Sequence, residues 1–196
     1  MFGTKSSAAV AFLMMLGGAA LAFASQPGGT GAGETEVYRG VVDTRGWRGP
    51  VRVTLRVNSH STDEDLRAIE TTLADKGQEA MFGALAGMKI NGWLSFEQDL
   101  GYPVTMLGEQ PTGKGRRIVA LVGRPLRFTE LWWGAQSVRY PFTLIVLDVD
   151  GNGVGHGTLV PAARARLDKQ GNIAFDDYLP IPYRILRVRE DPAVGS

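Results

Sequence analysis

Six consecutive residues, Asp148 to Gly153, have the spacing that opens a calcium-binding loop. Asp148, Asp150 and Asn152 supply oxygen atoms at the first, third and fifth positions, and a glycine follows at the sixth, as in an EF-hand. The twelfth position is Leu159, which cannot supply the carboxylate that closes such a loop. Two interpretations stay open: a weak calcium site of another geometry, or a tight turn between antiparallel strands, which we expect. No other cofactor is expected.

His60 and His156 are the two histidines of the chain, so histidine-dependent catalysis or a zinc site must use them. His60 precedes a predicted helix start, where a solvated loop or cap residue is expected. His156 follows the turn on a predicted strand and could lie near Asp148 across the hairpin. A metal-assisted or His/Asp-dependent hydrolase using His156, Asp148 and Asp150 is therefore the alternative functional hypothesis.

Arginines recur at alternate positions on two predicted strands. Arg164 and Arg166 alternate on one strand, and Arg187 and Arg189 alternate on another. Because alternate residues of a strand face the same side of its sheet, two such strands side by side would make a cationic face for an anionic ligand. The competing interpretation is a wet face with acids interspersed, namely Asp168, Asp176, Asp177 and Glu190.

Trp132 and Trp133 are adjacent, with Phe128 and Leu131 close by in the chain. An exposed aromatic pair can stack on sugars or contact a protein partner. The competing interpretation is core packing beneath a loop. Together with the four arginines above, this pair makes up the predicted ligand-binding set.

Composition excludes several classes of function. The chain has no cysteine, which rules out disulfides, thiol nucleophiles and thiolate metal sites. Its 21 Lys and Arg nearly balance its 20 Asp and Glu. A neutral chain has no general electrostatic reason to bind nucleic acid or anionic lipid, so only local arginine clusters could do so.

The N-terminus predicts a cleavable signal peptide over residues 1–24. Lys5 precedes an apolar run from Ala8 to Leu21, and Ala22-Phe23-Ala24 supplies small residues for the peptidase. Cleavage is expected after Ala24, or alternatively after Ala22. The competing membrane anchor is disfavoured because the run is shorter than the roughly 20 apolar residues that span a bilayer. The mature chain is thus expected to be periplasmic or secreted, with no membrane span.

The rest of the chain divides into a leader and a folded region. Residues 25–33 are glycine-rich and predict a flexible leader, and residues 34–192 predict one globular domain. A capping box, either Ser61 with Glu64 or Thr62 with Asp65, predicts a helix start. Gly77 is expected to end or bend this helix, and a second helical stretch is expected over Gln78–Met88.

Most of the remaining pattern is that of strands. Val51–Asn58 alternates cleanly between apolar and polar residues, and Phe142–Val149 is apolar on both faces, as in a covered central strand. Gln110–Gly115 reads as a turn. We predict an α+β fold: a curved antiparallel sheet of about nine strands with a helical hairpin packed on one face. A partly closed barrel around the helix is the close alternative.

Several short motifs resemble an uncharacterised family of exported bacterial proteins, known only as hypothetical proteins. They are Gly115-Arg116-Arg117-Ile118-Val119, Arg124-Pro125, Tyr140-Pro141-Phe142-Thr143, Gly155 with Gly157, Arg187-Val188-Arg189, and Ser61-Thr62-Asp63 with Gly77. The resemblance implies a compact periplasmic or secreted domain. It implies no activity and no catalytic residue.

The function predicted from these observations is an exported, non-enzymatic binding or accessory module of the cell envelope. Its partner is expected to be a small molecule or an envelope protein, and not a nucleic acid. A cavity between sheet and helices would suit an apolar ligand.

Overall fold

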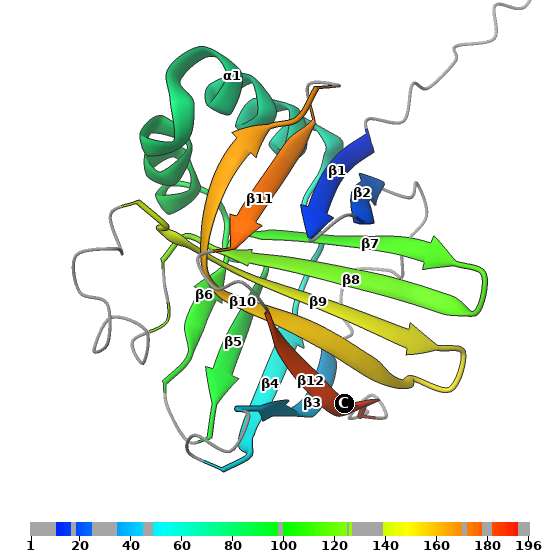
Figure 1. Cartoon of the computed structure of the whole chain (residues 1–196). Coiled ribbons are helices and arrows are strands. Elements are labelled where there is room, and N and C mark those ends of the chain that lie inside the picture. Colours follow the sequence, from blue (N-terminus) through cyan, green and yellow to red (C-terminus); the bar gives the residue numbers. More distant parts are fainter. Residues whose placement is uncertain are drawn as a thin grey trace, which may run out of the picture.

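Ten antiparallel strands and one helix form the body of the computed structural model (Figure 1). The structure describes residues 11–16, 19–24, 35–44, 49–97, 100–124, 126, 139–169, 172–177 and 182–191. The ten strands are β3 (Glu36–Asp43), β4 (Val51–Val57), β5 (Gly92–Phe96), β6 (Tyr102–Val104), β7 (Met106–Thr112), β8 (Gly115–Val122), β9 (Phe142–Asp150), β10 (Val154–Leu167), β11 (Ile173–Asp177) and β12 (Tyr183–Glu190).

The sheet curves until its two edges meet. Its strand order is β6-β5-β4-β3-β12-β10-β9-β8-β7, with β11 pairing with the far half of β10. The edge strands β6 and β7 follow each other in the chain and are separated only by Thr105, whose backbone N–H donates to the Leu121 carbonyl. The sheet therefore forms a nearly closed barrel, which confirms the curved antiparallel sheet and favours its barrel-like form.

Alternating apolar residues fill the inside of this barrel. Tyr38, Leu55, Leu94 and Ile118 are all buried there, from four different strands. Beside Tyr38 lies a narrow space of about 160 Å³ that is partly open to solvent and is lined by residues such as Leu55 and Ile185. The described part of the barrel interior is thus a packed core. The cavity between sheet and helix that was expected for an apolar ligand stays a prediction.

A second core lies outside the barrel, beneath the helix α1 (Asp63–Ala86). Leu66, Ile69 and Met81 of the helix pack there with Phe142 and Leu144 of β9. The other side chains of β9, such as Ile145 and Leu147, belong to the barrel interior. This confirms that β9 is apolar on both faces because it is covered on both.

Helix α1 begins as the sequence predicts but continues further. Thr62 is the N-cap and forms a capping box with Asp65, which settles the choice between the two predicted boxes. Gly77 takes φ 79° and ψ −175°, a conformation that other residues rarely adopt, and bends the helix there. The helical hairpin is therefore only partly right, because the two predicted stretches form one kinked helix.

One predicted turn is wrong in its bounds. Gln110–Gly115 was expected to be a turn, but β7 continues to Thr112 and β8 begins at Gly115, so only Gly113 and Lys114 turn. The hairpin can be this long because Gln110 and Pro111 pair with Arg117 and Arg116 at a sheet edge. A proline is tolerated there, since the missing N–H is not needed by a further strand.

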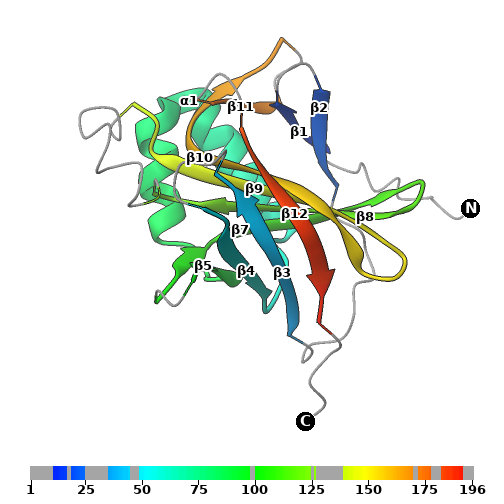
Figure 2. The same cartoon turned by 60° about the horizontal axis from the view of Figure 1, so that its bottom comes forward.

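The described N-terminal residues form two short strands, β1 (Ala11–Leu16) and β2 (Ala19–Ala24). They pair with each other and form a separate two-stranded sheet near β7 and β11 (Figures 1 and 2). Both lie within the segment predicted to be a signal peptide, whose cleavage stays a prediction. No described helix is long and apolar enough to cross a membrane.

Candidate functional site

Arg164 and Arg166 are exposed on β10, as predicted, but both are paired. Arg164 Nη2 donates to Asp176 Oδ2 at 3.0 Å, and Arg166 Nε donates to Asp176 Oδ1 at 2.9 Å. Burial acts to raise the pKa of Asp176, but the two arginine hydrogen bonds outweigh it, so this pKa is lowered. These two arginines thus fit the interpretation of a wet face with interspersed acids.

Arg187 and Arg189 lie on β12, which borders β3 on one side and β10 on the other. The two predicted arginine strands are therefore neighbours, but β12 pairs with the first half of β10, whereas Arg164 and Arg166 lie on its second half, where β11 pairs. The side chains of Arg187 and Arg189 are exposed. They do not alternate simply, because a β-bulge separates Leu186 from Arg189 in the pairing with β3. Arg187 is the extra residue and has φ 53°, a strained conformation for a residue with a side chain.

Gly40 makes this bulge possible from the opposite strand. A Cβ atom at Gly40 would lie 2.7 Å from Ile185 Cγ2 and 3.2 Å from Val188 Cγ2, the two residues that flank the bulge on the inside of the barrel. The bulge therefore packs against a strand that has no side chain at that point. As a result, Ile185 and Val188 both stay in the core while Arg187 stays in solvent.

Strands β12, β3 and β4 together expose six arginines, which we call the outer arginine face. The six are Arg39, Arg52, Arg56, Arg184, Arg187 and Arg189. The pairing register places Arg39 directly opposite Arg189, and Arg52 opposite Val41 beside Leu186. Figure 2 shows these strands on the side of the barrel turned away from α1.

Carboxylates are scarce on this face. Arg39 pairs with Asp191, and Asp43 is the register partner of Arg184. Within the described part of the chain, Arg56, Arg187 and Arg189 form no ion pair with any carboxylate. Like charges directly opposite each other destabilise a sheet, and at the Arg39 and Arg189 pair Asp191 compensates the charge of Arg39.

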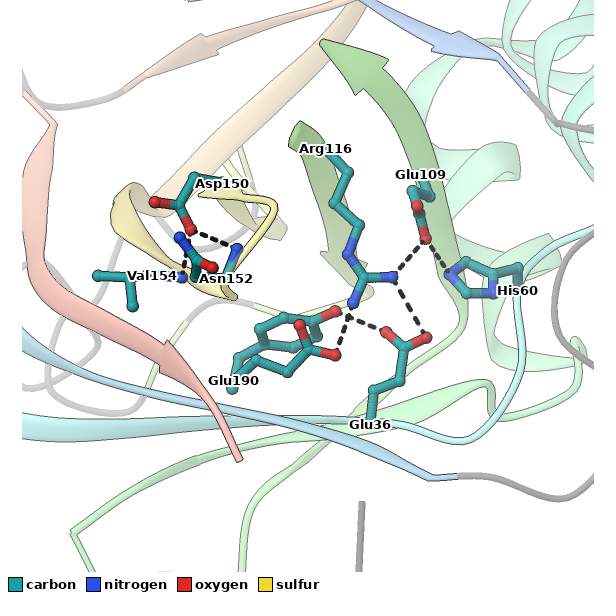
Figure 3. Close-up of polar contacts among 9 residues, drawn as sticks. Glu36, His60, Glu109, Arg116, Asp150, Asn152, Val154 and Glu190 are labelled. Atoms are coloured by element: carbon teal, nitrogen blue, oxygen red, sulfur yellow. Dashed lines mark hydrogen bonds and ion pairs between the residues drawn. The ribbon is translucent and has the colours of Figure 1, made fainter. Parts of the chain in front are cut away.

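A seventh arginine, Arg116 of β8, has the opposite surroundings at one end of the barrel (Figure 3). Its Nη2 donates to Glu190 at 2.6 Å, and its Nη1 lies 3.4 Å from Glu109 and 3.5 Å from Glu36. These acids come from β12, β7 and β3, so one guanidinium joins four strands. The guanidinium also lies over the ring of Tyr38, 5.7 Å from its centroid.

We call Arg116, its three acids and Tyr38 the arginine cluster. Its electrostatics favour the charged form of Arg116. Burial opposes the charge on Arg116, but the hydrogen bond to Glu190 and the nearby acids outweigh it and raise the pKa of Arg116. Burial and the 2.6 Å hydrogen bond to Glu36 raise the pKa of Tyr38, so this phenol stays protonated. The cluster therefore links β3, β7, β8 and β12 through the hydrogen bonds and ion pairs of Arg116.

Sequence patterns alone did not predict this cluster. In the sequence, Arg116 belongs to the Gly115–Val119 motif, and Glu190 is one of the acids interspersed among arginines. No local pattern links either of them to Glu36 or Glu109. They meet only because the register of β3, β7, β8 and β12 aligns them. One signal was available: Glu36 and Tyr38 share the inward side of an alternating strand, where a carboxylate needs a buried cation.

The predicted calcium residues lie at the turn between β9 and β10, where other groups bind them. Both carboxylate oxygens of Asp148 accept hydrogen bonds from Arg117, at 2.6 and 3.1 Å. Asp150 Oδ1 accepts from the backbone N–H groups of Asn152 and Val154 (Figure 3). The Val154 and Asn152 amides lower the pKa of Asp150. This is the geometry of the expected tight turn, and the calcium site stays a prediction.

The two histidines lie apart from each other. His156 is exposed and is the register partner of Asp148, whose oxygens are engaged by Arg117. His60 Nε2 lies 3.6 Å from Glu109 Oε2, at the margin of the arginine cluster. No group of three or more His, Asp or Glu residues in the described ranges is arranged to hold a metal ion.

Trp132 and Trp133 fall outside the described residues, so their predicted role stays a prediction. Comparison of the chain with protein-family models, curated proteins and solved structures finds no match. The surface chemistry of this chain is therefore the guide to its function.

Proposed function

We propose that the chain is an exported binding module of the cell envelope that recognises an anionic partner through the outer arginine face. The observation that carries the proposal is the excess of arginine on β12, β3 and β4. Arg56, Arg187 and Arg189 make no described ion pair, whereas Arg164 and Arg166 share Asp176. Arginine is the residue best suited to bind phosphate, sulfate or carboxylate groups in a bidentate manner.

Two features of the backbone support this proposal. Arg189 lies directly opposite Arg39, and only Arg39 of the two has a described carboxylate partner, Asp191. Arg187 has a positive φ, and strained residues tend to persist where they serve binding. A sequence under selection for stability alone would favour glycine or asparagine at Arg187.

Export is the second part of the proposal, and it depends on the predicted signal peptide. Its test is the N-terminal sequence of the protein recovered from the periplasm or the medium. The proposal expects the chain to begin at Ser25, or at Phe23 if the alternative site is used. Recovery of an intact Met1 to Ala24 segment in the cytoplasm would contradict export.

Binding is tested by chromatography of the exported protein on immobilised heparin, a polyanion that serves as the probe for anion binding. The variant R56Q/R187Q/R189Q should elute at much lower salt than the wild type, because exposed charges act through screened attraction. The matched control R117Q/R164Q/R166Q removes the same number of charges from arginines that already have carboxylate partners. Elution of the two variants at the same salt concentration would contradict the assignment of the outer arginine face as the anion-binding surface.

A further inference from the structure

Exposed apolar side chains border the outer arginine face on both sides. Trp93 of β5 is the register partner of Arg56 and is 39% exposed. Val154 of β10 is the register partner of Arg189 and is 47% exposed. Leu100 lies in the hairpin between β5 and β6 and is fully exposed. The arginines thus occupy a band with an apolar border.

This combination of side chains matches the chemistry of a bilayer surface. Tryptophan prefers the boundary between headgroups and acyl chains, and an exposed leucine at a hairpin tip gains stability by entering it. Arginines beside them would meet the phosphates of anionic lipids, each adding about 1 kcal/mol of attraction near the surface. Asp191, an acid beside this face, is paired with Arg39 and so opposes such contact less than a free carboxylate would.

The shape of the face also favours a surface over a small ligand. The arginines lie on the outside of three adjacent strands of a barrel, so the face is convex. The space of about 160 Å³ beside Tyr38 belongs to the barrel interior and is lined by apolar residues such as Leu55 and Ile185. A convex band of separate cations can contact many headgroups at once but cannot enclose one anion.

Building on the function proposed above, we infer that the anionic partner is a membrane surface rich in anionic phospholipid. The outer arginine face contacts the lipid phosphates, and Trp93 and Leu100 enter the headgroup boundary. The protein is then a peripheral membrane-binding module of the envelope.

The test is co-sedimentation of the exported protein with vesicles. One set contains phosphatidylglycerol mixed with phosphatidylcholine, and the other contains phosphatidylcholine alone. Wild-type protein should bind the anionic vesicles only. The variant R56Q/R187Q/R189Q should bind them about a hundredfold more weakly, at roughly fivefold per arginine, while R117Q/R164Q/R166Q binds within about threefold of wild type.

A second variant separates lipid from other anions. W93S/L100S keeps every arginine, so it should retain its elution from heparin but bind anionic vesicles about tenfold more weakly, because it loses apolar insertion. Both residues are exposed, so the fold should tolerate the change. Circular dichroism and the unfolding midpoint check this directly.

The outcomes distinguish the two proposals. Heparin binding that depends on the arginine face, without binding to anionic vesicles, would overturn the lipid inference and leave the proposed function in place. Equal binding of wild type and W93S/L100S to vesicles would also overturn it. Absence of both heparin and vesicle binding would overturn both.

Discussion

Arginine occurs in two contrasting settings in this barrel. Arg116 is surrounded by Glu36, Glu109 and Glu190 at the barrel end, whereas Arg56, Arg187 and Arg189 have no described carboxylate within ion-pair distance. In the first setting, which we call closed, burying the Arg116 guanidinium costs desolvation free energy, and its hydrogen bonds and neighbouring charges compensate that cost. The second setting, which we call open, leaves the charge of the arginine available to another molecule. The surroundings of an arginine, and not its presence, therefore indicate whether it stabilises the fold or binds a partner.

The largest expected effect comes from removing the arginine of the closed setting. R116M leaves three carboxylates close together without their cation, and we expect it to lower the free energy of unfolding by about 2 kcal/mol at neutral pH. Urea unfolding followed by circular dichroism measures this. Adding E190Q should recover part of the loss, since it removes one of the uncompensated charges. An unchanged unfolding midpoint for R116M would contradict the stabilising role of Arg116, because Arg116 would then behave like a surface residue.

Tyr38 belongs to the same closed setting and should give the next largest effect. Y38F removes the donor of the 2.6 Å hydrogen bond to Glu36 while keeping the buried ring beneath Arg116. We expect a loss of about 1 kcal/mol in the free energy of unfolding. An unfolding midpoint that Y38F leaves unchanged would show that the hydrogen bond to Glu36 contributes nothing to stability.

The open setting should respond in the opposite direction. R187G replaces a strained residue by one that adopts positive φ freely, and we expect a gain of about 0.5–1 kcal/mol in the free energy of unfolding. The same variant should bind anionic vesicles more weakly. R187N, which also tolerates this conformation, provides a control that keeps a side chain. Destabilisation by R187G would mean that Arg187 makes a structural contact, and it would place this residue in the closed setting.

The smallest effect is expected for the paired surface arginines. R164Q/R166Q should change stability by less than about 0.5 kcal/mol near neutral pH. The pKa of Asp176 is lowered in the folded protein, so its contribution is present above the ordinary aspartate pKa and is lost as the pH falls through the folded value. The variant should therefore show a shallower loss of stability on acidification. An identical loss of stability at low pH in wild type and variant would contradict the pairing of Asp176 with Arg164 and Arg166.

The sequence predicted local features better than those that depend on register. Alternation placed Val51–Asn58 correctly within one residue of β4, and the capping box at Thr62 is confirmed. Local signals also placed a bend at Gly77, but they could not indicate whether the chain would leave the helix there. That outcome depends on packing of Met81 and Leu85 against the outside of the barrel.

The candidate sites were harder to predict because they join strands that are distant in the chain. Glu36 and Glu190 are 154 positions apart and meet only through the pairing of β3 with β12. The bulge at Arg187 has no local signal, since arginine is not a residue that favours positive φ. Arg164 and Arg166 were correctly expected to be exposed, but their neutralisation by Asp176 depends on the register of β10 with β11.

The central claim is that the outer arginine face is the binding surface, and its most direct test is an NMR titration. Backbone amide shifts of the exported, isotope-labelled protein would be followed on addition of sucrose octasulfate, a soluble polyanion. We predict that the largest shifts lie in β3, β4 and β12, around Arg39, Arg187 and Arg189. Shifts concentrated instead on β10 and β11, around Arg164 and Asp176, or at the Asp148–Gly153 turn, would contradict it.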